Sequence, residues 1–312
     1  MSETRPRSIY AVAAGAIFAT AAVVLWTRIN PEQRPQFVDL TAAPAAARAP
    51  VQHAVRFAVA PVWAPERTLD VHYDLARYVA RAIGRPLRVV QRRTFGEVNE
   101  LLRRRGVDAA IIGTGTYLLA RRDDIALDVI AVPVVAEGPM FHSVIVVKSD
   151  SPLRSLDDLE GRTIGFSDPL SISGHYYPIS VIVARGKDPH TYFARSVFTY
   201  GHFGSIRAVL DGIVDAAAIN SLSYDFEGPR TDLRVIHRSP PFAISPVVVP
   251  RVSEPRFVAA LTRALLTMHT TNEGLAILHE LHLTRFEAPP PGLYDDAARI
   301  VDTVLRQEGA SQ

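Results

Sequence analysis

The chain has 312 residues, of which 48% are hydrophobic and 21% charged, and its formal net charge is +2. This composition is typical of a globular protein of one or two domains with a sizeable core. The sequence contains no cysteine, which excludes disulfides, thiolate metal sites, cysteine nucleophiles and a lipid anchor on cysteine. Basic runs such as Arg103, Arg104 and Arg105 are not interleaved with aromatic residues, so no nucleic-acid partner is expected.

An uncharged apolar segment, residues 9–26, follows Arg5 and Arg7 near the N-terminus. As a helix, about 18 residues span roughly 27 Å, close to the hydrocarbon thickness of a bilayer. A secretory signal has a shorter apolar region, so we expect residues 1–28 to form an uncleaved signal anchor, a transmembrane helix. Signal cleavage near residues 42–43 or 45–47 is the alternative. Both interpretations predict that the rest of the chain is exported.

Residues 29–53 are rich in proline and alanine and lack apolar periodicity, which is typical of a semi-extended tether. From residue 55 onward, strand and helix patterns alternate. This alternation predicts parallel sheets covered by helices on both faces. The first set of predicted elements comprises strands at 55–60, 87–91 and 109–112 and helices at 69–83 and 95–105.

A second set of alternating elements follows in the sequence. It comprises strands at 143–147, 163–166, 196–199 and 216–219 and helices at 155–159, 173–185 and 205–211. Two further strands are expected to return to the first sheet, at 233–237 and 246–249. The last predicted helices lie at 255–269, 272–282 and 293–307.

Two α/β sets predict two lobes around a cleft, with the chain crossing between them near residues 137–142 and 240–245. We expect lobe 1 in residues 54–141 and 241–288, lobe 2 in 142–240, and a C-terminal helix in 289–312. Ligands of open α/β sheets bind beyond the carboxyl ends of the strands. The loops predicted there are 113–116, 168–174, 200–204 and 220–223.

One of these loops has the features of an anion site. The preceding strand breaks at Asp168, and a helix restarts with Ser171, Ser173 and Gly174 in its first turn. Backbone N–H groups at a helix start have no partner within the helix and carry partial positive charge, and serine hydroxyls add donors. Ordinary N-capping by serine is the alternative. No general base or nucleophile elbow accompanies these serines, so hydrolysis is not expected. We expect no enzyme, metal or cofactor.

Five sequence features occur together and in order. They are the segments 146–161, 166–169, 171–174, 201–202 and 212–218. In these features the chain resembles the solute-binding proteins of phosphonate, phosphite and phosphate ABC transporters, the PhnD-like group of type 2 periplasmic binding proteins. The resemblance extends over residues 55–249. It implies the two-lobed type 2 periplasmic-binding-protein fold and a binding role without a cofactor.

The resemblance implies that Ser171, Ser173 and His202 hold the oxyanion, with Ile172 and Gly174 completing the helix start. The family's helix start has threonine where this chain has Ile172, so one hydroxyl donor is missing. A hydrogen bond to a charged group contributes about 1.5–3 kcal/mol. The change therefore lowers affinity unless Tyr200 or a water replaces the donor.

The resemblance also places two tyrosines that bind a ligand amine on Phe95 and Phe141, and a glutamate near Leu222. An ammonium buried without a carboxylate is costly. We therefore expect phosphite, phosphate or a simple phosphonate such as methylphosphonate rather than an aminoalkylphosphonate. Core packing is the alternative for the two phenylalanines, and Asp225 or Glu227 is the alternative source of an acid.

Thr114 and Tyr117 follow the strand at 109–112 and are predicted first-lobe contacts, although Tyr117 can equally pack under its own helix. Together these inferences predict a solute-binding protein that captures a small oxyanion and delivers it to an ABC permease. It would act on the periplasmic side of the bacterial inner membrane, anchored through residues 9–26, or free in the periplasm if the signal is cleaved. The alternative is a membrane-tethered sensor protein that presents its ligand to a sensor kinase.

Overall fold

The computed structural model describes residues 54–59, 65–136, 138–226 and 231–310. The transmembrane helix predicted in residues 1–28 and the tether in 29–53 lie outside the described residues. Among the helices of the described ranges, none is both long and apolar enough to cross a membrane.

Six strands of the described residues form the first sheet: β1 (Val55–Val59), β2 (Leu87–Gln91), β3 (Ala109–Ile111), β4 (Leu127–Val134), β10 (Val247–Pro250) and β11 (Arg285–Glu287). Their order across the sheet is β11-β4-β10-β3-β1-β2. β1 is parallel to β2 and β3, whereas β10 is antiparallel to β3 and β4, and β11 is antiparallel to β4.

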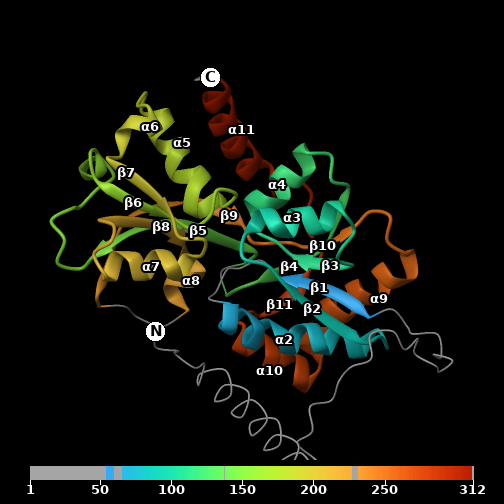
Figure 1. Cartoon of the computed structure of the whole chain (residues 1–312). Helices are drawn as coiled ribbons and strands as arrows, with labels where there is room; N and C mark the ends of the chain where they lie inside the picture. Colours follow the sequence, from blue (N-terminus) through green and yellow to red (C-terminus); the bar gives the residue numbers. More distant parts are fainter. Residues whose placement is uncertain (1–53, 60–64, 137, 227–230, 311–312) are drawn as a thin grey trace, which may run out of the picture. The chain divides into compact units, whose positions relative to one another are not determined.

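Helices cover both faces of the first sheet (Figure 1). One face carries α2 (Pro65–Ala82), α9 (Pro255–Leu266) and α10 (Asn272–Glu280), and the other carries α3 (Phe95–Arg103) and α4 (Thr114–Arg122). The alternation of side chains along β1 explains this arrangement. Phe57 belongs to the core shared with Leu75 of α2 and Leu261 of α9, and its neighbour Ala58 belongs to the core shared with Val98 of α3.

Five strands of the described residues form the second sheet: β5 (Met140–Lys148), β6 (Thr163–Phe166), β7 (Arg195–Phe198), β8 (Ala216–Asn220) and β9 (Leu233–Ala243). Their order is β7-β6-β8-β5-β9. β6 is parallel to β7 and β8, and β5 is antiparallel to β8 and β9.

The second sheet is also covered on both faces. Val144 of β5 packs into a core with Ile206 of α7 (His202–Leu210), and the next residue, Ile145, packs into the opposite core with Ile182 of α5 (Tyr177–Ala184). The shorter elements are η2 (Asp157–Leu159), η3 (Ile172–Tyr176), α6 (Pro189–Tyr192), α8 (Ser221–Asp225) and η4 (Met268–Thr270).

The prediction that the strand at 233–237 returns to the first sheet is wrong. β9 continues to Ala243 and pairs with β5 from Met140 opposite Ala243 to Lys148 opposite Leu233. The second half of this strand was not predicted because it contains Pro240 and Pro241. Proline lacks the N–H that a β-ladder needs, so it argues against a strand. β9 lies at the edge of its sheet, where proline is tolerated.

The expectation of parallel sheets holds only for three strands at one side of each sheet, β3-β1-β2 in the first and β7-β6-β8 in the second. The sequence patterns also missed β4, which contains Pro133, and the three-residue strand β11. In the first sheet β4 lies beside β10, and β11 forms the edge beside β4. The molecule is therefore a mixed α/β protein with two sheets.

The chain passes between the sheets twice, from β4 to β5 and from β9 back to β10. The predicted lobe limits at 141/142 and 240/241 fall within β5 and β9, and the lobe assignment stays a prediction. The last helix, α11 (Asp295–Ala310), packs against both α4 and α5 (Figure 1). Just before it, the hydroxyl of Tyr294 donates to the carbonyl of Ile244 at 3.0 Å.

Candidate anion-binding site

The predicted helix start after β6 is present, but its first turn is a π-helical turn, η3, that leads into α5. Ser171 is the N-cap, and its Oγ accepts a hydrogen bond from the N–H of Gly174 at 3.0 Å. Capping by serine, the alternative left open by the sequence, is therefore correct for Ser171. The same hydroxyl still has a proton to donate. π-helical turns are rare and are frequent at functional sites.

Ser173 follows the cap and is buried, with 2% of its surface exposed. Its carbonyl accepts a hydrogen bond from Ser143 Oγ at 2.6 Å. The N–H groups of Ile172 and Ser173 lie at the start of the turn, where no intrahelical acceptor exists. The turn therefore presents backbone donors, and the Ser143 contact fixes its orientation against β5.

Gly174 is required by its surroundings. A Cβ at this position would lie 1.8 Å from Ser167 Oγ and 2.7 Å from Ser167 Cβ, both inside van der Waals contact. Ser167 Oγ is buried, and no hydrogen-bond partner for it exists in the described part of the chain. Sequence reasoning did not identify Ser167 as a site residue, although it directly precedes the Asp168 break.

Asp168 is a buried carboxylate, with 1% of its surface exposed. Its Oδ1 accepts from the N–H of Leu170 at 2.8 Å, and its Oδ2 accepts from the N–H of Phe95 at 3.2 Å. Burial raises the pKa of this carboxyl above its usual value. Because Phe95 begins α3, Asp168 joins the loop after β6 to a helix that covers the first sheet.

His202 begins α7 and is buried, with 3% of its surface exposed. The backbone N–H of Asn220 donates to its Nδ1 at 3.2 Å. Burial lowers the pKa of the imidazole to about 3, so the ring is neutral near pH 7. With Nδ1 acting as an acceptor, the proton is on Nε2, and this N–H is a donor.

One cross-strand pair links the two predicted anion-binding groups. Ser143 of β5 and Asn220 of β8 are opposite each other in the antiparallel ladder. Ser143 holds the carbonyl of Ser173, and Asn220 donates to His202. The structure thus attaches both groups to the same point at the end of the second sheet.

Two predicted first-lobe contacts have protein partners of their own. Thr114 Oγ1 donates to the carbonyl of Ala243 at 2.6 Å. Tyr117 packs edge-on against Tyr294, with ring centroids 5.0 Å apart, so the packing alternative for Tyr117 has direct support. Thr116 is not among the contacts predicted from the sequence. Its hydroxyl is buried and finds no hydrogen-bond partner among the described residues.

The start of α4 approaches the helix start after β6 very closely. A Cβ on Gly115 would lie 2.3 Å from the carbonyl oxygen of Leu170 and 2.9 Å from the nitrogen of Ile172. Only glycine allows this approach of backbone to backbone. The sequence signal for it is a glycine between two threonines, Thr114 and Thr116, directly after a buried strand.

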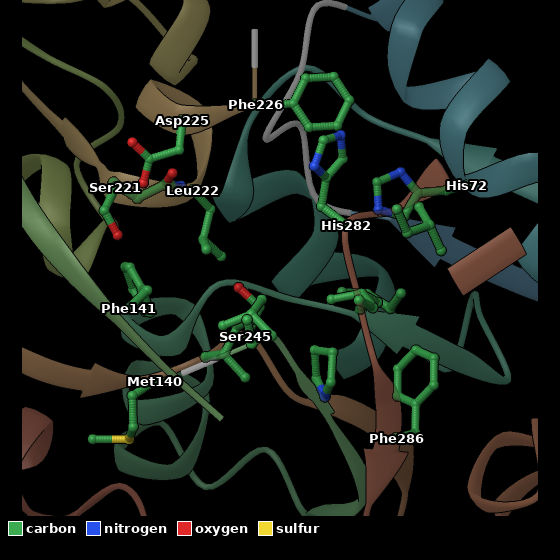
Figure 2. A pocket seen from close by; sticks show the side chains of 18 of the residues that line it. His72, Met140, Phe141, Ser221, Leu222, Asp225, Phe226, Ser245, His282 and Phe286 are labelled. Atoms are coloured by element: carbon green, nitrogen blue, oxygen red, sulfur yellow. The ribbon is translucent and has the colours of Figure 1, made fainter. Parts of the chain in front are cut away.

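The two phenylalanines predicted at the site lie in different surroundings. Phe95 is buried, and a Cβ on Gly113 would lie 3.1 Å from its ring. Phe141 packs edge-on against Phe242, with centroids 6.1 Å apart, and lines a cavity of about 350 Å³ together with Leu222 (Figure 2). The sequence did not predict this cavity.

In the described ranges there is no cluster of three or more metal-ligating side chains.

Donors at a helix start and a neutral histidine lie beyond the carboxyl ends of strands in a two-sheet α/β molecule. These features define a two-sheet α/β solute-binding protein. The chain belongs to the family described as ABC transporter, phosphonate, periplasmic substrate-binding protein, which matches residues 57–294. The family resemblance inferred from the sequence is confirmed. Members of this family are periplasmic substrate-binding proteins and not enzymes.

Two curated relatives match parts of the chain. The phosphonates-binding periplasmic protein of Escherichia coli is 34% identical over 130 residues, which cover 38% of each protein. The phosphate-import protein PhnD of Mycolicibacterium smegmatis is 27% identical over 158 residues, 47% of this chain and 49% of that protein. The matched region thus spans less than half the length of either relative.

Solved structures show the same fold. A binding-protein component of an ABC phosphonate transporter from Pseudomonas aeruginosa matches with a TM-score of 0.75 and 21% identity, covering 84% of this chain and 89% of that one. PhnD1 from Prochlorococcus marinus, in complex with methylphosphonate, matches with a TM-score of 0.74 and 17% identity, covering 81% and 98%. At these identities the likeness shows the fold alone.

Proposed function

We propose that this protein binds a phosphate or phosphonate group at the start of η3 and delivers the ligand to an ABC permease. The observation that carries the proposal is the cross-strand pair Ser143 and Asn220, which fixes the donors of Ser173 and His202 at one place. The proteins named above support the choice of anion. The two curated relatives are named for phosphonates and for phosphate, and PhnD1 is in complex with methylphosphonate.

The proposed site binds the anion with neutral donors. The N–H groups of Ile172 and Ser173, the hydroxyls of Ser171 and Ser173, and His202 Nε2–H would each donate to a phosphoryl oxygen. Hydrogen bonds to a charged acceptor are roughly twice as strong as neutral ones. A buried neutral imidazole suits this role because it donates without needing a counter-charge of its own.

Ile172 removes one hydroxyl that the family's helix start would provide. Thr116 lies on the facing turn, one residue after Gly115, and its hydroxyl is buried without a partner in the described residues. In our proposal Thr116 replaces the missing donor. Thr114 and Tyr117, the contacts predicted from the sequence, would then support the turn through Ala243 and Tyr294.

The environment of the ligand tail favours an uncharged substituent. Phe95, Phe141 and Leu222 occupy the positions at which the resemblance expects two tyrosines and a glutamate, and none of them carries charge or a hydrogen-bonding side chain. A ligand ammonium at this place would lose its hydration without a paired carboxylate from these residues. Phosphate, phosphite and simple phosphonates therefore fit the proposed site better than aminoalkylphosphonates.

The proposed location is the periplasm, with the chain held at the inner membrane through residues 9–26. A membrane anchor keeps a binder close to its permease and raises the effective concentration of both. Sequencing the N-terminus of the protein purified from membranes tests this point. An N-terminus beginning after residue 42 would show cleavage and contradict the anchor. A sensor kinase as the partner stays a prediction from the sequence.

A thermal-shift screen tests the ligand class. The purified protein would be heated with phosphate, phosphite, methylphosphonate, sulfate or acetate at about 100 times the expected Kd. A ligand bound only by the folded state then adds about 2.7 kcal/mol of stability, which raises Tm by about 4–5 °C for a chain of this size. We expect the shift with one or more of the phosphorus oxyanions. A shift with sulfate or acetate alone would contradict the proposal.

A further inference from the structure

The cavity of about 350 Å³ lies next to the proposed anion site. Asn220, whose N–H is bonded to His202, lines this cavity. On the neighbouring strand, Phe141 also lines it, and Phe141 is two residues from Ser143, which holds Ser173. Residues two apart on a strand point to the same face of the sheet. The cavity therefore begins at the cross-strand pair that fixes the anion-binding groups.

The wall of the cavity joins both sheets. Phe141 and Leu222 come from β5 and from α8, which follows β8, and Ile111 and Phe286 come from β3 and β11 of the first sheet. Figure 2 shows Leu222 pointing into the open space between Phe141 and His282. On one side Phe226 contacts His282, with ring centroids 4.7 Å apart. This contact joins the segment after α8 to the segment after α10.

The size and chemistry of the cavity exceed what an inorganic anion needs. Its volume equals the share of roughly twelve waters in liquid water, and it falls within the range of small-molecule pockets. Most of its lining is aliphatic or aromatic: Leu75, Ile111, Met140, Phe141, Leu222 and Phe286 are examples. A phosphate or phosphite bound at η3 would leave this apolar volume unused.

We infer that the ligand is an organic phosphonate or phosphate monoester whose apolar tail, several carbons long, occupies this cavity. The inference rests on the proposed function, because it requires the phosphoryl group to be held at η3. Burying the apolar surface of the tail would add binding free energy to that of the oxyanion contacts.

The charged residues of the wall do not favour an amine-bearing tail. Asp225 and Arg238 both line the cavity, so a carboxylate and a guanidinium contribute opposite charges to the same wall. Asp225 also takes part in an interaction of its own and is not a free carboxylate. An ammonium entering the cavity would meet no net negative charge from this pair, whereas an alkyl or aryl group needs none.

Isothermal titration of the full chain with a phosphonate series tests the inference. The probes are methyl-, ethyl-, propyl- and butylphosphonate. A fifth probe, 3-aminopropylphosphonate, has a tail as long as butyl that ends in an ammonium. Each buried methylene is expected to tighten binding about fourfold, and the amine is expected to bind at least tenfold more weakly than butylphosphonate. Affinity that stays flat from methyl to butyl, or a preference for the amine, would overturn the inference. If no phosphonate or phosphate binds at all, the proposed function itself fails.

A cavity-filling variant locates the tail. In Leu222→Trp, the added ring would occupy the cavity, and the butyl-to-methyl affinity ratio is expected to fall to about one. Leu275→Trp is the matched control, because Leu275 lies exposed on α10, and its ratio is expected to equal that of the wild type. Should Leu222→Trp not fold, Leu222→Phe provides a smaller filling. A wild-type ratio in the folded variant would place the tail elsewhere and contradict the inference.

Discussion

At the scale of single residues, the surroundings of His202 decide its chemistry. The sequence identified this histidine through its resemblance to a family motif, but a motif does not reveal a protonation state. The structure buries the ring and places the Asn220 N–H against Nδ1. Burial disfavours the imidazolium, and the contact fixes the tautomer that leaves Nε2–H free to donate.

This protonation state predicts how stability depends on pH. The unfolded chain binds a proton on this histidine near its ordinary pKa of 6.5, whereas the folded chain does not until about pH 3. The unfolded state therefore binds more protons between these values, and the free energy of unfolding falls as pH decreases through this window. For this one group the loss between pH 7 and pH 5 is about 2 kcal/mol.

Urea unfolding at pH 7 and pH 5 measures this effect. The difference between the two pH values is expected to be about 2 kcal/mol smaller in His202→Asn than in the wild type. His175, whose pKa is lowered to about 4, acts in the same direction, and Asp168, whose pKa is raised, acts in the opposite direction. Both are present in the variant and in the wild type and cancel in the comparison. An equal pH difference in the two proteins would contradict a neutral buried His202.

At the scale of elements, the start of α4 is packed against the turn that leads into η3. The backbone of Gly115 lies so close to Leu170 and Ile172 that a side chain does not fit. This contact joins a helix of the first sheet to the proposed anion-binding turn of the second. Disrupting this contact should therefore lower both the stability of the fold and the affinity for the ligand.

Gly115→Ala tests this contact, with Gly96→Ala as the matched control. An added Cβ at Gly115 meets Leu170 O at 2.3 Å, whereas at Gly96 in α3 the nearest atoms lie 3.9 Å away. Overpacking costs about 1–3 kcal/mol, and alanine in a helix is roughly 0.5–1 kcal/mol better than glycine. We expect a lower Tm and weaker methylphosphonate binding for Gly115→Ala only. Equal unfolding temperatures for the two variants would contradict the close approach.

Most elements could be predicted from periodicity, and the failures have physical causes. β3 and the first four residues of β8 are short apolar runs that follow an aspartate, and both were predicted. The second half of β9 was missed because its two prolines break the strand pattern, although an edge position tolerates them. The start of η3 was predicted as α-helical, since a π-helical turn has no distinct side-chain period.

At the scale of the whole molecule, Asp168 links the loop after β6 of the second sheet to α3, which covers the first sheet. Its carboxylate accepts one N–H from its own loop and one from the first residue of α3. Because the side chain is buried, water cannot replace these bonds when the carboxylate is removed. The two donors would then stay unsatisfied.

Asp168→Ala should therefore destabilise the protein by about 2–6 kcal/mol, since each of the two unsatisfied buried donors costs about 1–3 kcal/mol. Asp188→Ala is a suitable comparison, because Asp188 caps the exposed start of α6 by accepting from the His190 N–H at 2.9 Å. Its loss should cost about 1 kcal/mol. Urea unfolding at pH 7 compares the two. A smaller effect for Asp168→Ala than for Asp188→Ala would show that the carboxylate does not hold the sheets together.

The cavity beside the proposed site could not be predicted from the sequence. Ile111, Phe141, Leu222 and Phe286 lie far apart in the sequence and meet only when both sheets are formed. Phe141 and Leu222 were recognised as tail positions, but nothing in the sequence gives the volume that they enclose. A local motif such as the serine-rich helix start can be predicted from the sequence, whereas a cavity formed by distant segments cannot.

The most direct test of the central claim is isothermal titration of methylphosphonate into the wild type, Ser173→Ala and His202→Asn. We expect one binding site per chain in the wild type, and at least about tenfold weaker binding in each variant, because a hydrogen bond to a charged group contributes about 1.5–3 kcal/mol. Wild-type affinity in both variants would contradict a phosphoryl site at the start of η3.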